Sequence, residues 1–206
     1  MNIALLLALS LSLAHGKICR VTDYGAVGDN STEDTAALQS ALDACTPGTT
    51  IFPAPGKYLS RSLNLTGKSD IELVIEGGAT LVLWGDIDTW NTTGVFLDFL
   101  TNTAFHPAAL LRSSSTDTPT TNITIHGGGV IDGQGWRWWP FMKTRPRPRL
   151  VSMEKVVDFT LSNLTLLDSP GWNTNLRGAF MEITHMTVLS NAGSCRVVKS
   201  AQHGWF

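Results

Sequence analysis

The residue types best suited to bind a ligand lie between positions 133 and 149, where tryptophans are followed by arginines that alternate with prolines. Aromatic rings pack against the faces of sugars, and arginine pairs a carboxylate through two parallel N–H groups. The segment is therefore suited to a sugar polymer that carries carboxylates. With one tryptophan further along the chain, the candidate ligand-contacting residues are Trp136, Arg137, Trp138, Arg147, Arg149 and Trp172.

Two other interpretations of this segment stay open. Aromatics beside cations also suit nucleic acid, but 15 basic against 17 acidic residues give a net charge of −2, and no nucleic-acid-binding motif is present. We therefore expect no nucleic-acid partner. The second alternative is an extended, proline-rich loop whose tryptophans only cover the side of the fold.

Carboxylates and metal-ligand types give weaker signals. Asp23, Asp29 and Asp34 cluster near the N-terminus, in positions typical of turns and helix caps. No cysteine and histidine set has zinc spacing, and His203 stands alone before a glycine. The sequence therefore predicts no metal site and no cofactor.

The first residues of the chain resemble a targeting segment. Residues 3–13 are small or apolar and uncharged, and the small residues Ala14 and Gly16 follow. This run is shorter than the roughly 20 residues of a membrane span, and it has the length of a signal-peptide core. We expect a signal peptide over residues 1–16, a secreted chain and no membrane partner. The alternative is a buried N-terminal strand or an anchor.

Two further features are typical of a secreted protein. Cys19 and Cys45 flank a predicted helix, and pairing them would clip the N-terminal turn of the domain, whereas Cys195 has no partner left in the chain. Five sequons could accept N-linked glycans, although asparagine and threonine are also common in turns. These sequons begin at Asn30, Asn64, Asn91, Asn122 and Asn163.

One helix and many short strands are expected. Residues 31–34 offer N-cap hydroxyls and acidic first-turn residues, and apolar residues recur at helical spacing from Ala37 to Cys45, before Pro47 and Gly48 end the pattern. Low charge and abundant glycine, threonine and asparagine favour an all-β fold for the remainder. The helix, over residues 34–44, is placed to cap the first part of that fold.

The strand pattern repeats along the chain. Segments 73–81, 123–132, 159–168 and 181–190 each read as alternating apolar residues, a short turn and further apolar residues, with spacings of 50, 36 and 22. Such periods indicate a solenoid, and two short strands per repeat suit a parallel β-helix. Equivalent residues should stack in columns. The expected columns are Ile125, Leu161 and Ile183; Ile131, Leu167 and Leu189; and the polar set Asp132, Asp168 and Ser190.

Four segments carry a family resemblance: 21–29 (VTDYGAVGD), 127–136 (GGGVIDGQGW), 147–151 (RPRLV) and 164–173 (LTLLDSPGWN). Together they resemble the polygalacturonases, glycoside hydrolase family 28, over about residues 18–195. The resemblance implies a right-handed parallel β-helix that hydrolyses galacturonate polymers or related pectin with inversion, using carboxylates held apart by a water molecule.

The catalytic segments that the resemblance implies are an Asn-Thr-Asp segment, an Asp-Asp pair, a His-Gly pair and an Arg-x-Lys segment. None is found here, because residues 196–206 depart from the family pattern and His203 does not follow an Asp-Asp pair. No catalytic residue is therefore assigned. The expected division is a signal peptide over 1–16, N-terminal coils over 17–195 and a non-family tail over 196–206.

Three functions remain as alternatives. The first is the N-terminal portion of a secreted pectin hydrolase, inactive as it stands, with pectin or oligogalacturonide as its partner. The second is a carbohydrate-binding β-helix without catalysis, and the third is a lyase that uses clustered aspartates and calcium. We also expect self-association through the last coil, where Ile183, Met186, Val188 and Leu189 would face water.

Overall fold

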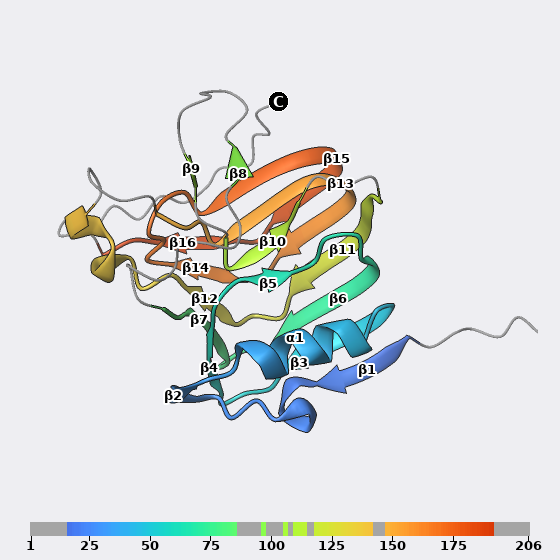
Figure 1. Cartoon of the computed structure of the whole chain (residues 1–206), viewed down its shortest axis with the longest axis horizontal. Helices are drawn as coiled ribbons and strands as arrows, with labels where there is room; N and C mark the ends of the chain where they lie inside the picture. The colour runs from blue at the N-terminus through green and yellow to red at the C-terminus, as the bar shows by residue number, and fades with distance from the viewer. Residues whose placement is uncertain are drawn as a thin grey trace, which may run out of the picture.

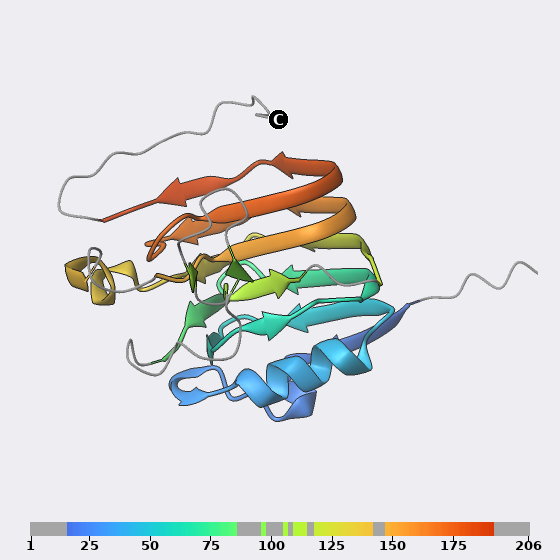
Figure 2. The same ribbon diagram turned by 45° about the horizontal axis from the view of Figure 1, so that its top comes forward.

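The computed structural model describes residues 16–85, 96–97, 105–106, 109–114, 118–141 and 147–191. Short parallel strands stack as rungs, from the blue N-terminal end to the orange and red C-terminal end (Figures 1 and 2). The expected right-handed parallel β-helix is confirmed. Alternating side chains explain the arrangement, because each strand turns one apolar row into the interior of the coil.

The larger sheet holds eight strands in the order β1-β3-β6-β11-β13-β10-β5, with β15 pairing β13 at the far end. All pairs within it are parallel. Its strands are β1 (Lys17–Arg20), β3 (Gly48–Phe52), β5 (Leu63–Asn64), β6 (Ser69–Ile75), β10 (Leu111–Ser113), β11 (Thr120–His126), β13 (Val151–Ser162) and β15 (Thr174–Thr184).

The smaller sheet faces the first across the core and holds six parallel strands in the order β16-β14-β12-β7-β4-β2. These strands are β2 (Asp29–Glu33), β4 (Lys57–Ser60), β7 (Thr80–Leu83), β12 (Val130–Asp132), β14 (Thr165–Leu167) and β16 (Thr187–Leu189). A separate antiparallel pair joins β8 (Phe96–Leu97) to β9 (Phe105–His106).

The predicted column of the larger sheet is confirmed. Ile125 pairs with Leu161, which pairs with Ile183, and Leu73 extends the column toward the N-terminus. Leu73, Ile125 and Leu161 are fully buried, whereas Ile183 on the last rung is 45% exposed. The column loses its cover at β15 among the residues that the structure describes.

The predicted columns of the smaller sheet are wrong by one residue. Ile131 pairs with Leu166 and Leu166 with Val188, so Leu167 and Leu189 lie on the next ladder position, opposite Asp132. The cause is turn length. Three glycines separate β11 from β12, whereas only two residues separate β13 from β14. Asp132 therefore does not share a ladder position with Asp168 and Ser190.

The glycine turn after β11 approaches the preceding rung closely. Gly127 has φ +129° and Gly128 has φ +84°, in the region that favours glycine. A Cβ on Gly127 would lie 2.7 Å from the carbonyl carbon of Ile75, whereas a Cβ on Gly128 would meet nothing closer than 3.7 Å. The two glycines are thus required for different reasons, steric at the first and conformational at the second.

Helix α1 (Thr35–Ala44) covers the first coil, as expected (Figure 1). Leu38, Ala41 and Leu42 are fully buried in the core. The predicted capping segment differs from the structure, because residues 29–33 form β2 and the N-cap Asp34 makes no side-chain cap bond. Its carboxylate instead accepts the backbone N–H groups of Val27 and Gly28, at 2.7 and 3.1 Å.

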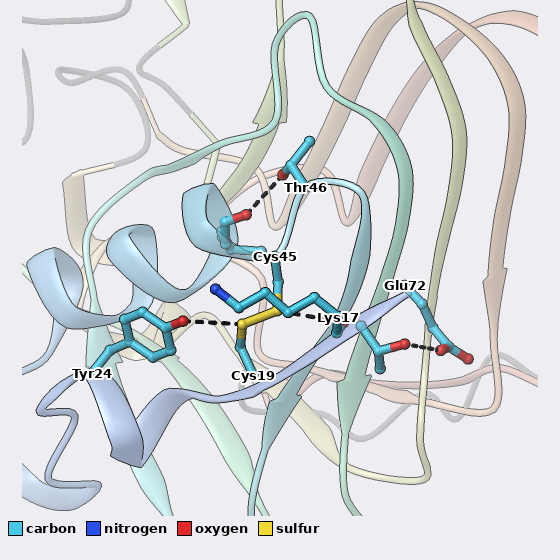
Figure 3. The surroundings of a disulfide bond; sticks show 8 residues. Lys17, Cys19, Tyr24, Cys45, Thr46 and Glu72 are labelled. Atoms are coloured by element: carbon cyan, nitrogen blue, oxygen red, sulfur yellow. Dashed lines mark hydrogen bonds between the residues drawn. A yellow bond between two sulfur atoms is a disulfide. The ribbon is translucent and has the colours of Figure 1, made fainter. Parts of the chain in front are cut away.

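A disulfide fastens this cap to the first strand. Cys19 of β1 is bonded to Cys45, the residue that follows α1, with their Cα atoms 6.0 Å apart (Figure 3). The hydroxyl of Tyr24 donates to the sulfur of Cys19 at 3.1 Å. Strand β1 is thereby tied to the end of the helix that covers the same coil.

Candidate functional site

The candidate ligand-contacting residues lie in two loops that leave neighbouring rungs of the smaller sheet. One loop follows β12 and contains the 3₁₀ helices Gly135–Arg137 and Trp139–Phe141, and the other follows β14. Three hydrogen bonds join them: Gly135 N to Asp168 O at 2.7 Å, Trp139 Nε1 to Ser169 O at 3.1 Å, and one described below from Arg147. The two loops therefore form one connected surface, which we call the loop surface.

The tryptophans of the first loop differ in exposure. Trp136 is 63% exposed, whereas Trp138 is 3% exposed and belongs to the hydrophobic core. Trp139 turns its indole N–H toward the second loop. The ring of Trp138 thus offers no surface to a ligand in this conformation, and Trp136 is the ring of this loop that a sugar could reach.

Trp172 and Arg149 form a stacked pair on the second loop. The guanidinium carbon of Arg149 lies 4.9 Å from the ring centroid of Trp172. Arg149 is only 5% exposed, while Trp172 is 63% exposed. A cation over an aromatic face is attracted by the ring quadrupole, so the buried arginine holds the exposed ring in place.

The remaining arginines each have a partner within the loop surface. Arg147 donates from Nη1 to the carbonyl oxygen of Pro170 at 2.9 Å, which is the third bond between the loops. Arg137 donates to Oε1 of Gln134 at 3.1 Å, and its guanidinium lies 5.7 Å from the ring centroid of Trp84. Both side chains are half-buried and lie beside exposed tryptophan surface.

Two carboxyl groups lie at the base of the loops. Asp168 is 8% exposed and accepts both the backbone and side-chain N–H groups of Asn191, at 2.7 and 3.1 Å. Burial raises the pKa of Asp132, and the nearby charge of Asp168 raises it further, while a hydrogen bond from Gln134 N opposes the shift. The sequence analysis treated both aspartates only as turn residues, although each directly follows a short apolar strand.

The other predicted sites are placed as follows. Asn30, Asn122 and Asn163 are exposed, whereas Asn64 is half-buried and accepts two hydrogen bonds from Thr66. Asn91, Cys195 and residues 1–15 and 192–206 lie outside the described residues. Within the described part of the chain, no three histidine, cysteine or acidic side chains are grouped as metal ligands, and no helix is long and apolar enough to cross a membrane.

Comparisons with known proteins assign this architecture to a family. The chain is 29% identical over 197 residues to exopolygalacturonase A of Aspergillus niger, which covers 93% of this chain and 43% of that protein. It is 33% identical over 167 residues to a probable polygalacturonase of Vitis vinifera, covering 75% of this chain and 33% of that protein. The chain thus spans less than half the length of these relatives.

A solved structure shares the fold. The hyperthermoactive exopolygalacturonase of Thermotoga maritima superposes with a TM-score of 0.67 and 18% identity, covering 84% of this chain and 47% of that one. Residues 48–201 match the profile of Glycosyl hydrolases family 28. The chain therefore belongs to glycosyl hydrolases family 28.

Proposed function

We propose that this chain is the N-terminal portion of a secreted, polygalacturonase-like protein, and that its own role is to bind pectin or oligogalacturonide without cleaving it. Two observations support the proposal. The chain covers under half of its polygalacturonase relatives. The catalytic segments that the family resemblance implies are not found in residues 1–206.

The observation that carries the binding role is the stacked pair on the second loop. The ring of Trp172 keeps 63% of its surface exposed while Arg149 fixes it from behind. A ring held in place loses little freedom when a sugar packs on it, which favours binding. Arg147 and Arg137 lie beside the exposed rings of the same loop surface, where they can attract a polymer of carboxylates.

Calorimetric titration with oligogalacturonate tests this role. Replacing Trp172 by alanine should weaken binding about tenfold, since one stacked ring contributes on the order of 1 kcal/mol. Phe180→Ala removes another exposed aromatic side chain, outside the loop surface, and is the matched control, with unchanged affinity expected. Equal affinities of the Trp172→Ala and Phe180→Ala chains would remove the loop surface as the binding site.

The same samples separate hydrolysis from binding. We expect no new reducing ends from polygalacturonate above a heat-treated control, because no catalytic segment of the family is assigned. Binding with no cleavage would favour the carbohydrate-binding alternative over a hydrolase. Reducing ends that form in proportion to enzyme would contradict the proposed role.

Secretion is part of the proposal. A signal peptide over residues 1–16 and glycans on the sequons would place the chain outside the cell. The exposure of Asn30, Asn122 and Asn163 supports modification at these three positions. Expression in a eukaryotic secretory host tests both points: the mature N-terminus should begin at Lys17, and enzymatic removal of N-glycans should lower the mass.

We further propose that the chain self-associates through its last coil. On β15, Phe180 is 79% exposed and Ile183 is 45% exposed, and these are unusual exposures for large apolar residues. An unpaired strand edge beside exposed apolar surface favours pairing with another chain. Sedimentation at micromolar concentration should show a species larger than the monomer.

A further inference from the structure

We propose that two copies of the chain pair antiparallel along β15, in a register that is set by the strand itself. This inference rests on the self-association proposed above and adds its geometry. Strand β15 has 11 residues, and among the described strands it pairs only with β13 (Figure 2). Its outer edge is therefore long enough to template a full strand.

The two faces of β15 follow from its pairing with β13. Leu176, Gly178, Met181 and Ile183 lie opposite Met153, Val156, Phe159 and Leu161, which are all fully buried, so these four positions face the interior of the coil. Arg177 and Glu182 occupy the intervening positions and face outward. The alternation changes phase between Gly178 and Met181, where Phe180 has φ +54°.

This phase change makes β15 self-complementary. In an antiparallel pair the residues opposite one another move in opposite directions along the two strands. A twofold axis between Ala179 and Phe180 places Leu176 opposite Ile183 of the second copy, and Gly178 opposite Met181 of the second copy. Every inward residue then meets an inward residue, and the side chain of Met181 gains the space that Gly178 leaves.

The charges select the same register. That axis places Arg177 opposite Glu182 of the second copy, and the twofold symmetry repeats this pair of opposite charges. An axis centred on Arg177 or on Glu182 would place like charges opposite each other, which destabilises a strand pair. The apolar pattern and the charge pattern therefore agree on one axis.

The same geometry predicts a closed assembly. A twofold interface uses one surface on both copies, and once the two β15 edges are joined no further β15 edge remains for a third chain. The chain should therefore stop at a dimer. Parallel, head-to-tail stacking would instead leave a free β15 edge at every step and build a filament.

Charge reversal measures the register. Sedimentation equilibrium should give a dimer dissociation constant that rises at least tenfold for Arg177→Glu and for Glu182→Arg. The double variant, with both changes, should return to within about threefold of the natural chain, because opposite charges again face one another. Lys155→Glu and Asp23→Arg reverse exposed charges outside β15 and should leave the constant unchanged.

Cysteine cross-linking tests the same register without relying on charge. In a Cys195→Ser background, Asn175→Cys and Thr184→Cys chains should form a disulfide-linked dimer when mixed, and neither should do so alone, because these positions lie opposite each other only between copies. Cross-linking of either variant alone, or no rescue by the double charge variant in a chain that still dimerises, would overturn the register. A monomer at 100 μM would overturn the self-association as well.

Discussion

Alanine substitution at three glycines should separate a steric requirement from a conformational one. Gly25, Gly127 and Gly128 all have φ between +84° and +129°. A Cβ on Gly25 would meet nothing within 4 Å, and a Cβ on Gly128 only atoms at 3.7 Å or more, whereas a Cβ on Gly127 would overlap the backbone of Ile75. Gly25→Ala is therefore the matched control for conformation alone.

The expected costs follow from these contacts. A left-handed conformation costs an L-residue about 1–2 kcal/mol, so Gly25→Ala and Gly128→Ala should each lower the free energy of unfolding by about that amount. At Gly127 the overlap adds about 1–3 kcal/mol, because backbone of the adjacent rung cannot move aside like a flexible side chain. The Gly127→Ala variant should therefore melt about 4–8 °C below the Gly128→Ala variant.

Urea unfolding monitored by circular dichroism and by tryptophan fluorescence gives these free energies, provided that the two probes report one transition. A loss at Gly127 no larger than that at Gly25 would show that the turn relaxes without strain. The explanation given for the register of the smaller sheet, which depends on this rigid three-glycine turn, would then be wrong.

Three further outcomes are expected. The hydroxyl of Thr49 donates to Glu72, and His126 is 2.8 Å from it, so the pKa of Glu72 is lowered; the stability from this group is present above its unfolded pKa and is lost as the pH falls through its folded pKa, and melting temperatures should fall less toward acid pH in Glu72→Gln than in the natural chain. The double change Cys19→Ser and Cys45→Ser should cost about 2–4 kcal/mol in urea unfolding, and an unchanged midpoint would show that the disulfide constrains nothing. Phe180→Asn should raise the midpoint slightly, by at most about 1 kcal/mol, because asparagine tolerates φ +54° better than phenylalanine, and a lower midpoint would indicate that the ring is packed.

The predicted column of the larger sheet matched the structure because alternation within a strand is local. Ile125, Leu161 and Ile183 each occupy the same place in a strand of regular alternation, so their alignment needs no knowledge of the turns. The alignment failed after Gly127, where one additional turn residue moved every later position by one. Turn length is not visible in a hydrophobic pattern, because glycines fit either count.

The loop surface could be located from the sequence, but its use of each side chain could not. Trp136 and Trp138 are two residues apart, and one is exposed while the other is in the core. The direction of each ring depends on the two 3₁₀ helices and on bonds to Asp168 and Ser169, which lie some 30 residues further on. Such contacts between coils arise only when the rungs have stacked.

The unequal spacing of the repeats has a consequence for how such a chain can change. Strands β11 and β13 keep equivalent residues in register across 36 residues, and β13 and β15 do so across 22, because the rungs pair while the loops leave the stack. Length can therefore be added or removed at a loop without disturbing the ladder beside it. Exchanging the loop after β12 for one of different length and composition should alter what the surface recognises while the solenoid persists, so recognition and folding can evolve separately in this architecture.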